Sequence, residues 1–263
     1  MLELKDLHKT FNPGTVNAKT ALNGLSLTLR DGEFVTVIGG NGAGKSTMLN
    51  AAGTLSVDSG EVHLDGVDVT DLPEYKRAAY IGRMFQDPMM GTAPSMHIEE
   101  NLALAARRGQ KRGLRWGITK AERERYRALL GDLGLGLETR LSSEVSTLSG
   151  GQRQVLTLLM ATLKSPKLLL LDEHTAVLDP KTAAKVMALT DRIVTKEKLT
   201  TLMITHNMRD AIQYGSRLVM LHEGRVILDI SGEEKENLTV SDLLAQFARV
   251  SGDEFASDRA LLS

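Results

Sequence analysis

The strongest constraint on the fold is a glycine-rich segment, GGNGAGKST at residues 39–47, which follows the apolar run at 34–38. It satisfies the pattern G-x-x-x-x-G-K-[ST], in which glycines let backbone N–H groups converge on phosphate oxygens at a helix start. Lys45 adds positive charge near the β and γ phosphates, and the Ser46 hydroxyl can bind Mg²⁺. The sequence therefore predicts a phosphate-binding loop between a buried strand and a helix. The alternative is an ordinary glycine-rich turn.

A second apolar run, at residues 168–171, ends on two adjacent acids, Asp172 and Glu173, which are followed by His174. In a protein with a phosphate-binding loop, an acid at the end of a neighbouring buried strand helps to hold Mg²⁺, and Asp172 fits that position. Glu173 is then free to orient and polarise an attacking water molecule. The alternative is that both acids leave the strand into solvent, an interpretation that the phosphate-binding loop disfavours.

A second anion-binding feature is predicted at the segment LSGGQ, residues 148–152. Ser149 is a good N-cap, and the two glycines after it leave backbone amides uncovered at the start of a largely apolar helix. The chain carries one phosphate-binding loop. Either the LSGGQ segment is simply a capped helix start, or it completes the phosphate site of another molecule.

The remaining patterns predict an α/β fold with three parts. An alternating stretch with turn residues at 60–70 predicts an antiparallel hairpin beside the main sheet. A capping-box pattern at 119–122 opens a helix within an expected helical lobe from about 90 to 165. A strand, a helix and a strand within 167–205 predict a parallel βαβ unit. We expect a P-loop NTPase core with a mainly parallel sheet, an antiparallel β subdomain and an inserted α-helical lobe.

Composition excludes some classes of protein. The 32 basic and 33 acidic residues leave a net charge of −1, so the overall charge gives no reason to expect a nucleic-acid partner. The absence of cysteine excludes disulfides and thiolate metal sites. The charged N-terminus lacks the apolar segment of a signal peptide, and no stretch approaches the ~18 apolar residues of a membrane span. We therefore expect a soluble protein whose membrane role, if any, comes through a partner.

Taken in order, the motifs resemble those of the ATP-binding subunit of an ATP-binding-cassette (ABC) transporter. The motifs are GGNGAGKST, Gln86, LSGGQ, LLLLDE, AVLD at 176–179 and His206, and the resemblance runs from about residue 2 to 230. It implies an ATPase domain at 1–235 and a C-terminal helix and tail at 236–263. It also implies a head-to-tail dimer, a homodimer by expectation, in which the P-loop of one subunit faces the LSGGQ segment of the other across ATP.

The resemblance implies roles for individual residues. Phe11 resembles the aromatic residue that stacks on adenine, and Gln86 resembles the glutamine that contacts Mg²⁺ and links the nucleotide to the membrane subunit. Asp172 resembles the acid that supports Mg²⁺, and Glu173 resembles the catalytic base. His206 resembles the histidine that touches the γ phosphate.

The expected site residues follow from these roles. The expected catalytic residues are Glu173, His206 and Gln86. The residues expected to bind ATP are Phe11, Gly39, Asn41, Gly42, Ala43, Gly44, Lys45, Ser46, Thr47, Gln86, Ser149, Gly150, Gly151, Gln152 and Asp179. The expected Mg²⁺ ligands are Ser46, Gln86 and Asp172. Ser149, Gly150 and Gly151 would act on the nucleotide of the other subunit.

Several of these residues have structural alternatives. Phe11 could be a core aromatic residue, His206 could be a satisfied core histidine, and Asp179 is a good helix N-cap in any case. Two positions depart from the family pattern: His174 stands where the family usually has proline, and Val177 replaces a small residue. These departures affect local geometry, because the acids beside them keep their spacing.

A basic segment with a tryptophan falls within the expected helical lobe. Its residues are Arg107, Arg108, Lys111, Arg112, Arg115 and Trp116. The two interpretations are a solvated charged face, or contact with anionic lipid headgroups or with cytoplasmic loops of a membrane partner.

The resemblance implies that the chain hydrolyses ATP at the cytoplasmic face of the membrane, bound to permease subunits and served by an extracytoplasmic solute-binding protein. LLLLDEHTAVLDP, NPGTVN and GRMFQDPMMGT are also similar to a narrower group of bacterial uptake ATPases assigned to tryptophan, tyrosine or related amino acids. Three alternatives stay open. They are the ATPase of an exporter, a soluble ABC ATPase that acts on DNA or ribosomes, and a nucleotide-binding regulator without turnover.

Overall fold

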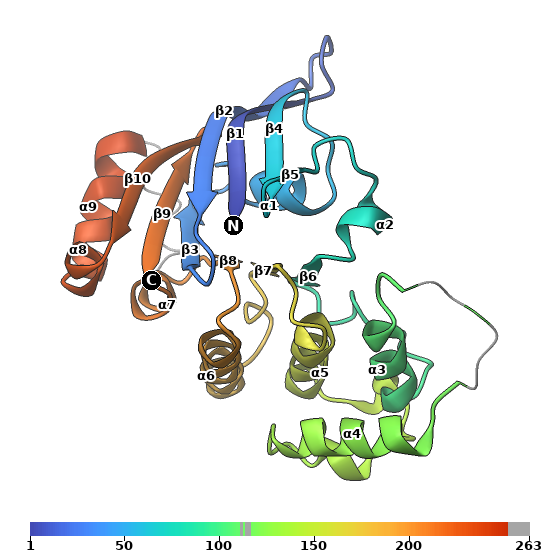
Figure 1. The fold of residues 1–263 in the computed structure, drawn as a ribbon. Coiled ribbons are helices and arrows are strands. Elements are labelled where there is room, and N and C mark those ends of the chain that lie inside the picture. Colours follow the sequence, from blue (N-terminus) through green and yellow to red (C-terminus); the bar gives the residue numbers. More distant parts are fainter. Residues whose placement is uncertain (111–112, 114–116, 252–263) are drawn as a thin grey trace.

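The computed structural model describes residues 1–110, 113 and 117–251 and contains two β-sheets flanked by helices (Figure 1). The larger sheet has the strand order β10-β9-β3-β8-β7-β6. Its strands are β3 (Phe34–Gly39), β6 (Ile81–Met84), β7 (Leu168–Asp172), β8 (Thr201–Ile204), β9 (Arg217–His222) and β10 (Arg225–Ser231). All neighbours pair in parallel except β10, which pairs antiparallel with β9. The predicted βαβ unit and the mainly parallel sheet are confirmed.

The smaller sheet is antiparallel and has the order β2-β1-β4-β5. Its strands are β1 (Leu2–Phe11), β2 (Lys19–Leu29), β4 (Ser59–Leu64) and β5 (Val67–Asp68). The predicted hairpin is confirmed as β4 and β5. Helix α1 (Lys45–Gly53) joins the two sheets, because its Met48 and Leu49 share one hydrophobic cluster with leucines of β1 and β2 and with β3, β7 and β8.

Two strands lack a clear sequence signal. In β1, bulges shift the register between Leu4 and Leu7, so the side-chain alternation is broken by Lys5 and Asp6. In β6, the four residues IGRM include a glycine and an arginine, which is a poor strand pattern. Each of these strands is held in place by backbone pairing with neighbouring strands of its sheet.

The helical region has a hydrophobic cluster of its own. It consists of α3 (Ile98–Ala106), α4 (Lys120–Gly131), α5 (Gly150–Thr162) and the 3₁₀ turns η1 (Leu137–Thr139) and η2 (Val145–Thr147). Tyr126 and Leu130 of α4 are buried against α3 and α5 in this cluster. The predicted capping box is present, since Thr119 Oγ1 accepts from the Glu122 N–H at 3.2 Å. The inserted helical lobe is therefore confirmed as part of the fold.

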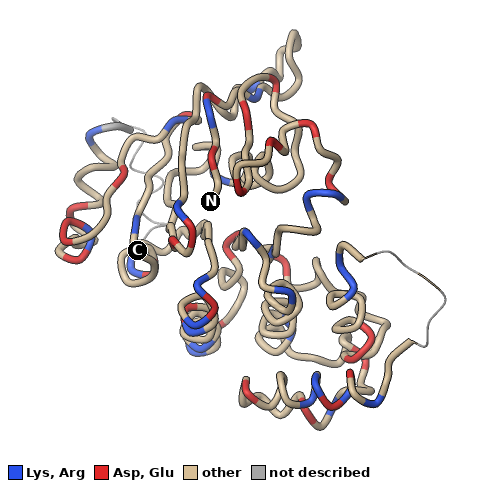
Figure 2. The backbone as a smooth tube through the Cα atoms, viewed as in Figure 1, with Lys and Arg blue, Asp and Glu red and all other residues tan. Residues whose placement is uncertain are grey.

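The remaining helices are α2 (Glu74–Arg77), α6 (Pro180–Glu197), α7 (Met208–Gln213), α8 (Glu233–Glu236) and α9 (Val240–Ser251). Residues of α6 cluster with β3, β7 and β8, and residues of α7 and α9 cluster with β3 and β9, so these three helices pack on the large sheet. Within the described residues, no helix has the length and apolar character needed to cross a bilayer. Figure 2 shows that acidic and basic residues are interspersed along the backbone of α4 and α6, in keeping with the balanced net charge.

His174 lies inside the protein, two residues after the end of β7, with 1% of its surface exposed. Its Nε2 lies 3.2 Å from the Thr190 hydroxyl, which itself donates to the Val186 carbonyl at 2.9 Å. Because the hydroxyl has only one proton to donate, the imidazole Nε2–H must be the donor in the first contact. Burial lowers the pKa of His174 to about 4, so the folded protein holds it neutral.

This burial predicts a pH-dependent loss of stability. Between pH 6.5 and about 4, unfolded His174 takes up a proton that the folded state excludes, so the free energy of unfolding falls as the pH falls. The shift corresponds to an expected loss on the order of 3 kcal/mol across this range. Urea unfolding of wild type and His174→Leu at several pH values measures the difference. The variant should lose less stability, and parallel pH profiles would contradict the prediction.

Candidate active site

The phosphate-binding loop connects β3 to α1. Gly44 is the N-cap of α1 with φ +100°, and a Cβ at this position would lie 2.4 Å from the Ala21 carbonyl oxygen, so only glycine fits. The Lys45 ammonium donates to the Gly39 carbonyl at 2.6 Å and to the Gly40 carbonyl at 3.1 Å. The loop thus combines the positive end of α1 with a buried lysine, which is the arrangement that binds phosphate.

Phe11 lies at the end of β1 and is 39% exposed, which excludes the core-aromatic alternative. Its cross-strand neighbour on β2 is Lys19. The Lys19 Nζ lies only 3.0 Å from the position that a Gly42 Cβ would occupy. The exposed ring and the phosphate-binding loop are therefore neighbours, with a lysine between them. Sequence reasoning missed Lys19, because only the register of β1 on β2 places it here.

Four functional segments emerge at one edge of the large sheet. β3, β8, β7 and β6 are adjacent and parallel, so their carboxyl ends lie at the same edge. The phosphate-binding loop follows β3, His206 follows β8, Glu173 follows β7 and Gln86 follows β6. The fold thus brings together motifs that are far apart in the sequence.

The two acids at the end of β7, Asp172 and Glu173, do not extend freely into solvent, because their side chains are only 17% and 21% exposed. Burial raises the pKa of the Asp172 carboxyl above its ordinary value. The guanidinium of Arg83 opposes this shift, with its Nη2 at 3.8 Å from Asp172 Oδ2. Arg83 is a second residue that the sequence did not single out.

Glu173 faces His206 across the sheet edge. The Oε2 of Glu173 lies 3.6 Å from the Nδ1 of His206. Contact with the imidazole lowers the pKa of Glu173, and contact with the carboxylate raises the pKa of His206. The His206 side chain is 47% exposed, which excludes the core-histidine alternative. Glu173 is therefore ionised at neutral pH, and the His206 imidazole beside it is exposed enough to contact a ligand.

The LSGGQ segment begins α5 as a capping box. The Ser149 Oγ accepts from the Gln152 N–H at 3.3 Å, and the Ser149 N–H donates to Gln152 Oε1 at 3.2 Å. A Cβ on Gly151 would lie 2.3 Å from Thr182 Cγ2, so this glycine permits the close packing of α5 on α6. Gly150 is exposed beside it. The segment belongs to the helical region, whereas α1 packs on β3, β7 and β8.

Asp179 caps α6, as the sequence allows. Its Oδ1 accepts from the Thr182 N–H at 3.0 Å. This hydrogen bond gives Asp179 a local structural role. Its partner, Thr182, is also the residue whose side chain packs beside Gly151.

The oxygen donors at the site suit Mg²⁺. Ser46 offers an exposed hydroxyl at the start of α1, Asp172 a carboxylate and Gln86 an exposed side-chain amide. Among the residues that the structure describes, no three His, Asp or Glu side chains converge into a complete metal cage. Mg²⁺ is commonly held by one or two protein oxygens together with phosphate oxygens and water, so this sparse donor set fits it.

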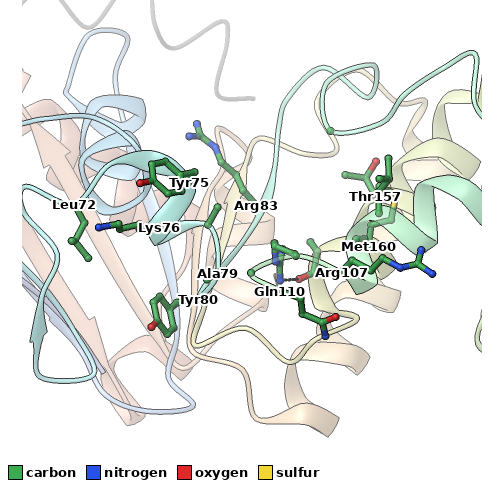
Figure 3. Close-up of a pocket in the computed structure, with 17 residues that line it drawn as sticks. Leu72, Tyr75, Lys76, Ala79, Tyr80, Arg83, Arg107, Gln110, Thr157 and Met160 are labelled. Atoms are coloured by element: carbon green, nitrogen blue, oxygen red, sulfur yellow. Dashed lines mark hydrogen bonds between the residues drawn. The ribbon is translucent and has the colours of Figure 1, made fainter. Parts of the chain in front are cut away.

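A groove of about 820 Å³ separates α2 and β6 from the helical region. Figure 3 shows Tyr75 and Tyr80 on one side of it, Thr157 and Met160 on the other, and Arg83 between them. Tyr75 is 73% exposed, so a large aromatic surface faces the solvent here. Its lining includes Arg83 of β6 and Gly91, which lie before and after Gln86 in the sequence.

The start of the predicted basic segment also borders this groove. Arg107 Nη2 donates to the Gly117 carbonyl at 2.6 Å and pairs with Glu122 at 3.0 Å, and Arg108 Nη2 donates to the Ala161 carbonyl at 3.2 Å. Both arginines therefore have internal partners, which argues against a simple solvated face for them. The rest of the segment, Lys111, Arg112, Arg115 and Trp116, lies outside the described residues.

Comparison with known proteins gives consistent results. Residues 22–176 match the sequence profile of the ABC transporter family. The tyrosine transport ATP-binding protein of Clostridioides difficile is 48% identical over 94% of this chain and 98% of its own length. The pyoverdine export ATP-binding/permease protein of Pseudomonas aeruginosa is 31% identical over the full chain, which spans 40% of that longer protein.

The fold also matches a solved structure. The dimeric post-hydrolysis state of the ATP-binding cassette MJ0796, bound to ADP and Pi, superposes with a TM-score of 0.75. Its sequence is 31% identical, and the match covers 88% of this chain and 98% of that one.

The position of Lys19 yields a test of the nucleotide site. An ammonium between the exposed ring and the phosphate-binding loop should strengthen binding of a nucleoside phosphate, so Lys19→Gln should weaken ATP affinity roughly three- to tenfold. Lys120→Gln, at the start of α4, makes the same charge change away from the site and is the matched control. Calorimetric titration with ATP, ADP and adenosine measures the effect. The loss should vanish for adenosine, and an equal loss for adenosine would place Lys19 at the base or ribose.

Proposed function

The chain belongs to the ABC transporter family of ATP-binding subunits, which hydrolyse ATP, and we propose that it powers an importer for tyrosine or a related amino acid. The support for the solute class is the relative named for tyrosine transport, which matches over nearly the full length of both chains. The exporter relative is less similar, at 31% identity. The observation that best supports the catalytic mechanism is the contact between Glu173 and His206 at the carboxyl edge of the sheet.

In the proposed mechanism the adenine of ATP stacks on Phe11, and the phosphates bind the amides of residues 41–47 and the Lys45 ammonium. The ionised Glu173 accepts a proton from a water molecule and orients it for in-line attack on the γ phosphorus. His206 donates a hydrogen bond to the γ phosphate. The bond between the γ phosphorus and the bridging oxygen breaks, and the products are ADP and phosphate.

Mg²⁺, when bound, neutralises charge that builds up on the β and γ phosphates. Ser46, Gln86 and Asp172 would hold it. Because burial raises the pKa of Asp172 while contact with His206 lowers that of Glu173, the two neighbouring acids differ in environment, which supports different roles.

We propose a homodimer for this reaction. The start of α5, where Ser149 and Gly150 are exposed and Gly151 and Gln152 follow, would bind the γ phosphate held by the P-loop of the second copy. Asp179 would lie near the same interface. The arrangement is supported by the single P-loop in the chain and by the dimeric MJ0796 cassette.

The groove beside β6 is the proposed docking site for a cytoplasmic segment of the permease. It lies between the sheet and the helical region, so relative movement of the two parts would change its width. The subunit would thereby be held at the cytoplasmic face of the membrane. Residues 1–235 form the proposed ATPase unit and 236–263 an appendage, and a separate extracytoplasmic solute-binding protein completes the system.

Replacing the proposed base tests the mechanism. Glu173→Gln should lower steady-state ATP hydrolysis by roughly 10²- to 10⁴-fold, because the amide cannot accept the proton. With ATP and Mg²⁺ it should elute as a stable dimer in size-exclusion chromatography. Glu197→Gln, at the end of α6, removes the same charge elsewhere and should keep normal turnover. Near-normal turnover of Glu173→Gln would exclude Glu173 as the base.

The transported solute requires a separate experiment. An affinity-tagged chain should co-purify with a permease and a solute-binding protein, identified by mass spectrometry. In vesicles containing the complex, tyrosine should raise ATP hydrolysis and accumulate on the side that carries the ATPase. Movement away from that side would make the system an exporter, and stimulation by another solute class but not by tyrosine would reject the proposed substrate.

A further inference from the structure

Gln154 joins three functional segments inside the protein. It lies on α5, one turn after the start of that helix, and is completely buried. Its Nε2 donates to the His174 carbonyl at 2.7 Å and to the Phe85 carbonyl at 3.4 Å. His174 directly follows the proposed base Glu173, and Phe85 directly precedes Gln86. One amide group therefore connects the LSGGQ helix to both segments.

The backbone at Glu173 needs such support. Glu173 has φ +43°, in the left-handed region that residues with a Cβ rarely adopt, and such strain persists only where the surroundings enforce it. The Glu173 N–H donates to the Ile204 carbonyl at 3.0 Å, and the Glu173 carbonyl accepts from the Ala176 N–H at 3.0 Å. The hydrogen bond from Gln154 to the carbonyl of the next residue, His174, holds this turn against α5.

The orientation of the amide is determined by its neighbours. Two carbonyl oxygens face the amide NH₂ group, which has two protons to donate, so the reverse orientation would place oxygen against oxygen. The Gln154 Oε1 has no hydrogen-bond partner and is buried. The two donated bonds therefore fix the orientation of the amide relative to the Glu173 and Gln86 segments.

We propose that Gln154 is a positioning residue for ATP hydrolysis. It holds the backbone of the Glu173 turn in the conformation that orients the carboxylate, and it links this turn to the Gln86 segment. The inference rests on the proposed role of Glu173 as the base. Gln154 acts through two backbone carbonyls and does not touch the nucleotide. Since both bonds start from α5, a displacement of this helix with the helical region would alter the Glu173 turn and the Gln86 segment together.

The test uses Gln154→Met, which keeps a long unbranched side chain and removes both hydrogen bonds. We expect kcat to fall roughly 10- to 100-fold, because small misplacements of a catalytic group cost this much, while KM and ATP affinity change less than about twofold. The matched control is Thr162→Val on the same helix, which removes a buried hydroxyl that bonds only to Leu158 and Leu159 of its own helix. It should keep near-normal kcat.

A double variant separates positioning from a general structural role. Single-turnover phosphate release is compared between Glu173→Gln and Glu173→Gln combined with Gln154→Met. If Gln154 acts through Glu173, the second substitution should lower the residual rate less than about twofold. Multiplicative losses, or parallel losses of kcat, ATP affinity and melting temperature in Gln154→Met, would overturn the proposal.

Gln154→Glu provides a second variant if Gln154→Met does not fold. A buried neutral carboxyl has the same shape and one proton to donate, so an intermediate loss of kcat is expected. Normal kcat in a folded Gln154→Glu or Gln154→Met protein would reject the positioning role while leaving the base assignment intact. Near-normal turnover of Glu173→Gln would instead exclude Glu173 as the base, the role on which this inference rests.

Discussion

The parallel pairing of β3, β8, β7 and β6 is the constraint on which the rest of the structure depends. Parallel strands place their carboxyl ends at one edge, and the residues that follow them form the site. All residues of β3 and β8 are buried, so their ends cannot shift without disturbing the core. The buried strands of the sheet therefore fix the positions of the site segments, and the loops supply the remaining residues.

Helix α5 connects this sheet to the helical region. Its Leu158 and Ala161 belong to the cluster on the sheet, whereas Leu156 and Leu159 belong to the cluster of the helical region. A helix that is apolar on both sides is required wherever two packed units share it. The same helix begins with the LSGGQ capping box, so the end that is proposed to bind phosphate and the two hydrophobic clusters are connected by one helix.

The residues at and near the end of β7 include several features that lower the stability of the fold. Glu173 has a strained backbone, His174 is buried in its neutral form, and Gln154 keeps a buried oxygen without a partner. Each of these features opposes stability. They cluster where the catalytic carboxylate is proposed to act, which is where proteins most often keep strained or incompletely paired groups.

The sequence by itself determined the features that depend on neighbouring residues. The phosphate-binding loop, the capping box at Thr119, the N-cap at Ser149 and the acids at the end of β7 are local patterns, since a cap or a tight turn needs only a few residues. Only the tertiary structure decided that Lys19 reaches Gly42, that Arg83 lies beside Asp172, and that Gln154 reaches the Glu173 turn. These contacts depend on strand register and on how α5 packs against the sheet, and no local pattern in the chain specifies either.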